Sequence, residues 1–255
     1  MKERLDILLV KKGLFETREK AKSAIMAGII VVDDKKIDKA GTLIKEESNI
    51  RIKGETLKYV SRGGLKLEKA IVDFNIDFNN RRVLDIGAST GGFTDCALQN
   101  GASYVYSVDV GTNQLNWKLR ENNKVKSIEN MHIKNLELDD LDNEKVDIIV
   151  IDVSFISLTK IILYFEKFLN ESGNIITLIK PQFEVGKENI TKGGIVKDEK
   201  EHLRAIEVVI NNAKEHKYYL NNLIKSPITG VKGNIEYLAL FSRVENNFKL
   251  DRELI

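Results

Sequence analysis

The sequence is poor in cysteine, proline and histidine, with one, two and three copies among 255 residues. The single cysteine, Cys96, excludes an intrachain disulfide framework and fits a reducing compartment. The histidines have no cysteine or carboxylate at ligand spacing, so we expect no metal site. No apolar run is long enough for a membrane-spanning helix, and charges interrupt the N-terminal MKERLDILLVKKG. We therefore expect a cytoplasmic protein without a membrane segment or a secretory signal.

Positive charge is concentrated near the N-terminus, although the whole chain has a net charge of only +2. Residues 1–66 contain 16 Lys and Arg against 10 Asp and Glu, a balance of +6. The rest of the chain contains 24 Lys and Arg against 28 Asp and Glu, a balance of −4. A basic N-terminal part beside a slightly acidic body favours a module that binds nucleic acid over a merely solvated surface.

Residues 1–58 are predicted to form a small α+β domain. Apolar spacing indicates helices over residues 4–13 and 17–28, with Thr17 as N-cap, and IIVVDDKKID and NIRIKGETL indicate short strands. This pattern resembles the αL-type (S4-type) RNA-binding domain. The matching residues are Arg4-Leu5-Asp6, Gly13, Thr17-Arg18, Ala21, Ile25, Gly28 and Val31-Val32. The resemblance implies that four side chains face RNA phosphates: Arg4, Arg18, Lys20 and Lys22.

The sequence after residue 82 alternates apolar strands with helical segments, which predicts a parallel α/β sheet covered on both faces. The expected strands are RVLDIGAS, YVYSVDVG, VKSIEN, DIIVIDVS and GNIITLIKP. Two further strands, YLNNLIKSPI and NIEYLALFSRV, are expected to form an edge hairpin with a short turn. Before the sheet, YVSRGGLKLEKAI (59–71) is predicted to pass through Gly63-Gly64 into a helix.

A glycine-rich segment, DIGASTGGFTD (85–95), joins the first of these strands to the next helix. Gly87, Gly91 and Gly92 permit a close approach to a ligand, and Asp109 at the end of the second strand can bind ribose hydroxyls. The spacing departs from the G-x-G-x-x-G of nicotinamide sites. Asp85 would repel a pyrophosphate but suits a cationic amino-acid end. S-adenosylmethionine (SAM) is therefore favoured over NAD.

Four polar residues occupy unusual positions: Lys66, Asp152, Lys180 and Glu236. Asp152 and Lys180 close the fourth and fifth strands, so parallel strands would bring them to one edge of the sheet. Pro181 restricts the backbone at Lys180. Glu236 reaches the same edge if the last strand is antiparallel. Taken one at a time, each of these residues could equally be a charge at a strand end or part of a surface ion pair, without a catalytic role.

Five motifs in this order resemble the TlyA family of ribosomal RNA ribose 2′-O-methyltransferases: SRGGLKL, DIGASTGGFTD, IDVSFISL, IKPQFE and GNIEY. The resemblance implies an αL-type domain over residues 1–58, a linker over 59–64 and an FtsJ-like Rossmann methyltransferase domain over 65–255 with an antiparallel last strand. It implies SAM as cofactor and, as target, a cytidine of 16S rRNA, 23S rRNA or both, in ribosomal subunits.

The resemblance also implies roles for individual residues. The family's Lys–Asp–Lys–Glu tetrad corresponds to Lys66, Asp152, Lys180 and Glu236. The implied cofactor-binding residues are Asp85, Gly87, Ala88, Ser89, Gly91, Gly92, Phe93, Asp109 and Glu129. Arg62 is added to the RNA-binding set. Two segments depart from the family, namely the linker at Leu57-Lys58-Tyr59-Val60 and Asn130-Met131-His132 after Glu129.

Several interpretations remain open at the level of sequence. Phe155 and Phe183 could stack on a flipped nucleotide or belong to the core. LTKIILYFEKFL (158–169) could be an inter-strand helix or, because some relatives carry a haemolysin label, a membrane-active segment. A non-catalytic ribosome- or RNA-binding protein and a NAD enzyme also remain open.

Overall fold

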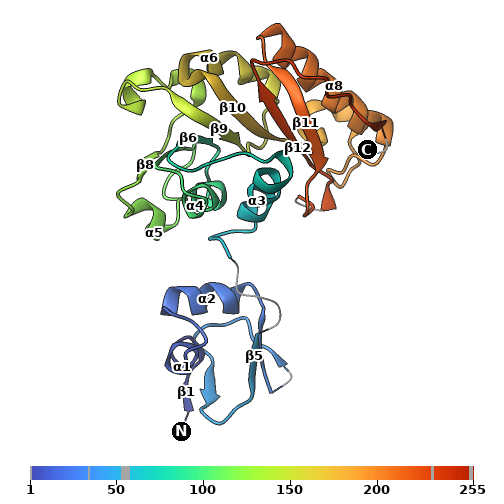
Figure 1. Cartoon of the computed structure of the whole chain (residues 1–255). Helices are drawn as coiled ribbons and strands as arrows, with labels where there is room; N and C mark the ends of the chain where they lie inside the picture. Colours follow the sequence, from blue (N-terminus) through green and yellow to red (C-terminus); the bar gives the residue numbers. More distant parts are fainter. Residues whose placement is uncertain (1, 34, 53–57, 231–232, 253–254) are drawn as a thin grey trace. The chain divides into compact units, whose positions relative to one another are not determined.

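The computed structural model describes the chain except for residues 1, 34, 53–57, 231–232 and 253–254. The chain divides into two compact units, residues 1–58 and 59–255 (Figure 1). Each unit has its own hydrophobic core. The segment 59–64, expected to be a linker, lies within the second unit.

The described residues of the N-terminal unit form two helices and five short strands. They are β1 (Lys2–Arg4), α1 (Leu5–Lys11), α2 (Arg18–Met26), β2 (Ile30–Val32), β3 (Lys35–Lys36), β4 (Leu43–Lys45) and β5 (Ile50–Ile52). The Thr17 hydroxyl accepts the Lys20 N–H and caps α2 as predicted. The sequence analysis missed β1 and β4, which pair antiparallel. The strand predicted over residues 49–57 is present as β5, and residues 53–57 lie outside the described part of the chain.

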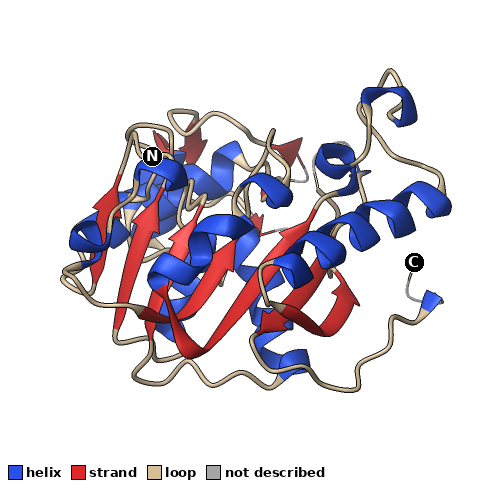
Figure 2. Ribbon diagram, turned by 90° about the horizontal axis from the view of Figure 1, so that it is seen from above, coloured by secondary structure: helices blue, strands red, loops and turns tan. Residues whose placement is uncertain are grey.

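The second unit is built on a seven-stranded sheet in the order β11-β12-β10-β9-β6-β7-β8. The strands are β6 (Arg82–Ile86), β7 (Tyr104–Val108), β8 (Val125–Ile128), β9 (Val146–Ile151), β10 (Leu169–Ile179), β11 (Tyr219–Lys225) and β12 (Tyr237–Ser242). Strands β6 to β10 are parallel to one another, and β12 is antiparallel to β10 and β11. The predicted Rossmann-like fold with an antiparallel last strand is therefore confirmed, and Figure 2 shows the twist of these strands.

Both faces of this sheet are covered, because successive strand residues point to opposite sides. Ile149 and Ile151 join the core that includes α6 and α8, whereas Ile148 and Val150 join the core that includes α3 and α4. The helices of the unit are α3 (Gly63–Phe74), α4 (Gly92–Gln99), α5 (Trp117–Arg120), α6 (Phe165–Phe168), α7 (Pro181–Glu184) and α8 (Glu199–Glu215). Short 3₁₀ turns are η1 (Ile133–Asn135), η2 (Leu138–Leu141), η3 (Leu158–Lys160), η4 (Ile162–Tyr164) and η5 (Lys187–Asn189).

Two expectations for this unit were wrong. The segment 158–169 is not one helix but the succession η3, η4 and α6, whose apolar residues Leu158, Ile162 and Phe165 are buried in the core. The connection between β11 and β12 is not a short turn, because β11 ends at Lys225 and β12 begins only at Tyr237, with residues 231–232 outside the described part. This loop contributes to the cavity described next.

Candidate active site

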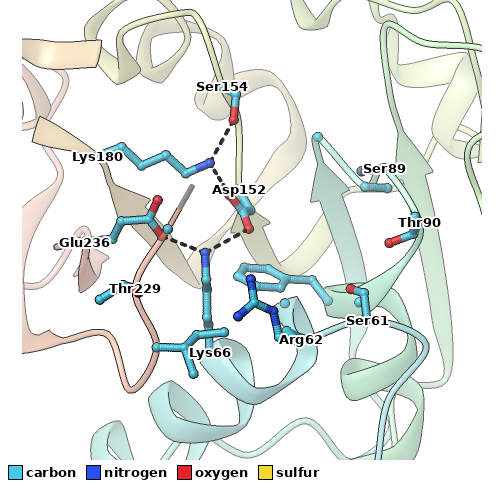
Figure 3. A pocket seen from close by; sticks show the side chains of 17 residues that line it. Ser61, Arg62, Lys66, Ser89, Thr90, Asp152, Ser154, Lys180, Thr229 and Glu236 are labelled. Carbon is cyan, nitrogen blue, oxygen red and sulfur yellow. Dashed lines mark hydrogen bonds and ion pairs between the residues drawn. The ribbon is translucent and has the colours of Figure 1, made fainter. Parts of the chain in front are cut away.

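The ends of three neighbouring strands bring polar side chains together. Asp152 follows β9 and Lys180 follows β10, and these strands are parallel neighbours, so their carboxyl ends lie at one edge. Because β12 runs antiparallel with Tyr237 opposite Ile179, the residue before it, Glu236, starts at that same edge. The fourth side chain, Lys66, comes from α3. Figure 3 shows the four side chains converging.

The four side chains form an alternating chain of charges. Lys180 Nζ lies 2.6 Å from Asp152 Oδ1, and Lys66 Nζ lies 2.6 Å from Glu236 Oε2 and 3.7 Å from Asp152 Oδ2. The two lysine side chains are each 9% exposed and Glu236 is 3% exposed. Buried charges are stable only when they are paired, and here two cations meet two carboxylates. The sequence prediction that these four residues lie together agrees with this geometry.

The segment before α3 sets the position of Lys66. Tyr59 is buried, and a β-carbon at Gly64 would lie 2.3 Å from the Tyr59 ring, so only glycine fits there. The Val60 N–H donates to Asp95 Oδ2 on α4 at 2.8 Å. This segment therefore packs on α3 and α4 and fixes the helix that presents Lys66.

A cavity of about 260 Å³ opens beside the charged cluster. It is lined by Ser61, Arg62, Gly63, Lys66, Gly87, Ala88, Ser89, Thr90, Gly92, Phe93, Asp152, Ser154, Lys180, Ile228, Thr229, Gly230 and Glu236. All four candidate catalytic residues and five of the candidate cofactor residues therefore share one cavity.

The loop after β6 depends on two glycines in the left-handed region. Gly87 has φ +82°, and a β-carbon there would lie 2.8 Å from the Asp152 carbonyl oxygen. Gly91 has φ +93°, and a β-carbon there would lie 2.3 Å from the Leu119 side chain. The Asp109 carboxylate accepts the Ser89 and Gly111 N–H groups at 2.8 and 2.7 Å, which joins this loop to the end of β7.

Comparison with known proteins identifies both units. The model of the FtsJ-like methyltransferase family matches residues 59–243, and that of the S4 domain matches residues 3–50. The chain belongs to the TlyA group of the FtsJ-like methyltransferases.

Three similar proteins cover almost the whole chain. "Putative rRNA methyltransferase YqxC" of Bacillus subtilis is 48% identical over 93% of this chain and 84% of its own length. "16S/23S rRNA (cytidine-2'-O)-methyltransferase TlyA" of Mycobacterium tuberculosis is 36% identical over 92% of this chain and 87% of its own length. A solved structure, "Putative hemolysin from Streptococcus thermophilus", has a TM-score of 0.78 and 45% identity, covering 99% of this chain and 94% of that one.

Membership of the FtsJ-like family implies the use of SAM, and the cavity fits such a group. The loop from Gly87 to Phe93 lines one side of the cavity, and at Gly87 a β-carbon would meet the Asp152 carbonyl oxygen, so the close approach of the loop to the end of β9 requires glycine. Asp109 uses its two oxygens to hold Ser89 and Gly111, and each oxygen keeps a lone pair for a ribose hydroxyl. Gly91 and Asp109 shape the loop without lining the cavity.

Asp85 lies under this loop and does not line the cavity. It is 0% exposed, its Oδ2 accepts the Thr94 hydroxyl at 2.6 Å, and its Oδ1 has no hydrogen-bond partner among the described residues. Burial raises the pKa of Asp85 to about 7, with a smaller contribution from the Asp152 charge, although the Thr94 hydrogen bond acts in the opposite direction. An effect of Asp85 on the cationic end of SAM would thus be electrostatic.

Glu129 also lies outside the cavity lining. Its carboxylate accepts the Asn113 N–H at 2.9 Å and pairs with Arg120 at 2.6 Å. Glu129 therefore holds the segment that follows Asp109 at the end of β7.

The predicted RNA-binding residues are in two places. Arg62 lines the cavity. In the N-terminal unit, Arg4 and Arg18 both bind the buried Asp6, at 3.0 and 2.8 Å, and their hydrogen bonds hold the pKa of the Asp6 carboxyl well below its ordinary value. Lys20 pairs with Glu16, and Lys22 is exposed. Asp6 thus fixes two guanidinium groups that remain nearly half exposed.

The sequence analysis missed several cavity residues, namely Ser61, Thr90, Ser154, Ile228, Thr229 and Gly230. Ser154 accepts a hydrogen bond from Lys180 Nζ at 2.9 Å. The sequence could have indicated Ser154, because it follows Asp152 by two positions within the motif IDVSFISL. The three residues from Ile228 to Gly230 were missed because the loop was expected to be a tight turn.

Phe155 is not a core residue. Its side chain is 92% exposed and its φ is +65°, while its ring lies 5.2 Å from that of Phe183. A large exposed aromatic side chain in a left-handed backbone conformation is costly, which points to a functional constraint at this position. Of the two roles that the sequence left open, the exposure excludes packing in the core.

Proposed function

We propose that this protein transfers a methyl group from SAM to a ribose 2′-hydroxyl of ribosomal RNA. The observation that carries the proposal is the Lys66–Glu236 and Lys180–Asp152 cluster, which borders the same cavity as the glycine loop. The FtsJ-like family match and the names of the relatives from Bacillus subtilis and Mycobacterium tuberculosis support it.

The chemistry assigns different tasks to the four residues. SAM, when bound along the loop from Gly87 to Phe93 with Asp109 near its ribose, supplies an electrophilic methyl group. Lys180 accepts the proton of the ribose hydroxyl, or as a cation stabilises the developing alkoxide. Asp152 and Glu236 hold Lys180 and Lys66 in place at 2.6 Å each and balance their charge. Fixed positions of the reacting groups supply much of the acceleration.

The target within the ribosome follows from the relatives. A cytidine of 16S or 23S rRNA is the target that the name of the Mycobacterium tuberculosis relative indicates, and we extend it to this chain. Arg4 and Arg18 in the S4 domain, with Arg62 at the cavity, supply the cations that contact phosphates. A protein that acts on rRNA would work in the cytoplasm.

The decisive experiment measures transfer of labelled methyl from SAM to purified, unmodified small and large ribosomal subunits. Wild type should label RNA with alkali-resistant linkages, which locate the methyl on the ribose. Lys180→Ala should bind SAM as wild type does in calorimetry and lose more than about a hundredfold in rate. If Lys180→Ala also loses SAM binding, Lys180 is a cofactor or folding residue.

The same assay tests the rival functions. No label with wild type, despite normal SAM binding, would favour a non-catalytic ribosome- or RNA-binding protein. A haemolytic role has less support because most apolar residues of segment 158–169 are buried in the core, with Leu163 as the exposed exception. Within the described residues, no helix combines the length and the apolar character needed to cross a membrane.

A further inference from the structure

Ser154 touches the candidate base from the side opposite to the other lysine. It lies on the loop after β9, and Lys180 Nζ donates to its Oγ at 2.9 Å while also contacting Asp152 Oδ1 at 2.6 Å (Figure 3). Ser154 is not one of the four tetrad residues, and a serine shortly after a strand is common and indicates no function by itself.

We propose that Ser154 is a positioning residue that aims the lone pair of Lys180 at the ribose hydroxyl. A neutral lysine amine has two N–H groups and one lone pair. Asp152 and Ser154 together accept both N–H groups, so the lone pair takes the remaining tetrahedral direction. Lys180 lines the cavity and is largely buried, so its side chain has little freedom to rotate.

Without the Ser154 hydroxyl, the amine could rotate about its Cε–Nζ bond and direct an N–H into the cavity in place of the lone pair. The proton of the 2′-hydroxyl would then have no acceptor in the reactive geometry. When the proton does pass to Lys180, the amine becomes an ammonium with three N–H groups, of which two are still accepted by Asp152 and Ser154. The serine therefore serves the base before and after the transfer.

The loop that carries Ser154 is fixed to the segment that carries Lys180. Glu184 in α7 accepts the Ser157 hydroxyl at 2.5 Å and the Leu158 N–H at 2.9 Å. This pair of bonds joins the loop after β9 to the helix that follows Lys180. The Ser154–Lys180 contact thus connects two segments that are already joined, which is what a fixed direction for the amine requires.

The inference rests on the proposed function, and three variants test it. Ser154→Ala removes the hydroxyl, and Ser154→Thr keeps it, with space for the added methyl because Ser154 is exposed. Ser157→Ala is the matched control, since it loosens the same loop through Glu184 without touching Lys180. The measurements are kcat, the KM values for ribosomal subunits and SAM, SAM affinity by calorimetry, and melting temperature.

We expect Ser154→Ala to lower kcat about tenfold to a hundredfold, with both KM values, SAM affinity and melting temperature close to wild type. Ser154→Thr should recover most of the loss, and Ser157→Ala should lower the melting temperature with a smaller effect on kcat. Wild-type kcat in Ser154→Ala, or an equal loss in Ser157→Ala, would overturn the inference while the methyl transfer of wild type stands. Absence of transfer by wild type would instead overturn the proposed function.

Discussion

Replacing Asp85 with asparagine should change how the stability of the catalytic unit depends on pH. Asp85 is fully buried beneath the glycine loop, and only one of its oxygens has a partner among the described residues, the Thr94 hydroxyl. Burial raises its pKa from the ordinary 3.8 to about 7, so a carboxylate is costly there at neutral pH.

The size and sign of the effect follow from linkage. One pKa unit corresponds to about 1.4 kcal/mol, so ionising Asp85 costs the folded state about 4 kcal/mol more than the unfolded chain. The folded state binds the proton more tightly, so this contribution to stability is fully present below pH 3.8 and is lost as the pH rises through about 7. Asparagine does not titrate, but its buried amide nitrogen lacks an acceptor, at a cost of about 1–3 kcal/mol.

Relative to Asp85→Asn, wild type should therefore lose up to about 4 kcal/mol of unfolding free energy between about pH 4 and pH 8. At pH 8 the variant should be the more stable protein by about 1–3 kcal/mol. Urea unfolding followed by fluorescence suits this test, because Trp117 is the single tryptophan of the sequence and lies in the catalytic unit.

The matched control is Asp139→Asn, which changes an exposed aspartate of the same unit. Its stability difference from wild type should stay constant with pH. If the difference for Asp85→Asn is also constant, or if the variant is several kcal/mol less stable at pH 8, the reasoning from burial is refuted.

Two further variants test side chains around the cavity. Phe155→Ala should raise the KM for RNA by about fivefold to 150-fold and leave SAM affinity unchanged, because base stacking contributes about 1–3 kcal/mol. Phe155→Trp should retain RNA binding. An unchanged KM in Phe155→Ala would exclude stacking. Gly230→Ala should lower both kcat and melting temperature, because the new β-carbon would lie 2.0 Å from Glu236 Oε1 and displace Glu236 from Lys66. Gly193→Ala should behave as wild type, because its β-carbon would make only an ordinary contact with Thr191 Oγ1 at 3.7 Å. Equal behaviour of the two glycine variants would show that Glu236 adapts without loss.

The sequence predicted those features that depend on strand periodicity and chain order. Apolar runs that end in Asp152 and Lys180 identified the strand ends, and parallel strands bring such ends together. The antiparallel last strand was expected from the hairpin of the last two strands and from the family resemblance, and its register with β10 brings Glu236 to the same edge.

Other features depend on packing that periodicity does not encode. In a sheet buried on both faces, the alternation of side chains does not show which way Asp85 points, and it points away from the cavity lining. Gly230 and Thr229 reach the cavity because the loop before β12 is long, and its length was misjudged. Phe155 is exposed and has a left-handed backbone conformation, neither of which an aromatic residue after an apolar strand indicates in the sequence.

The charges around the cavity indicate that different residues serve RNA binding and methyl transfer. Two lysines and two carboxylates cancel, so the tetrad itself offers no net attraction to an anionic RNA. Among the described residues that line the cavity, the remaining charged one is Arg62. In the S4 domain, the buried Asp6 neutralises one charge while orienting two, Arg4 and Arg18. The affinity for RNA must therefore come from cations outside the tetrad. The charges of the tetrad instead hold the Lys180 amine in its position for the reaction.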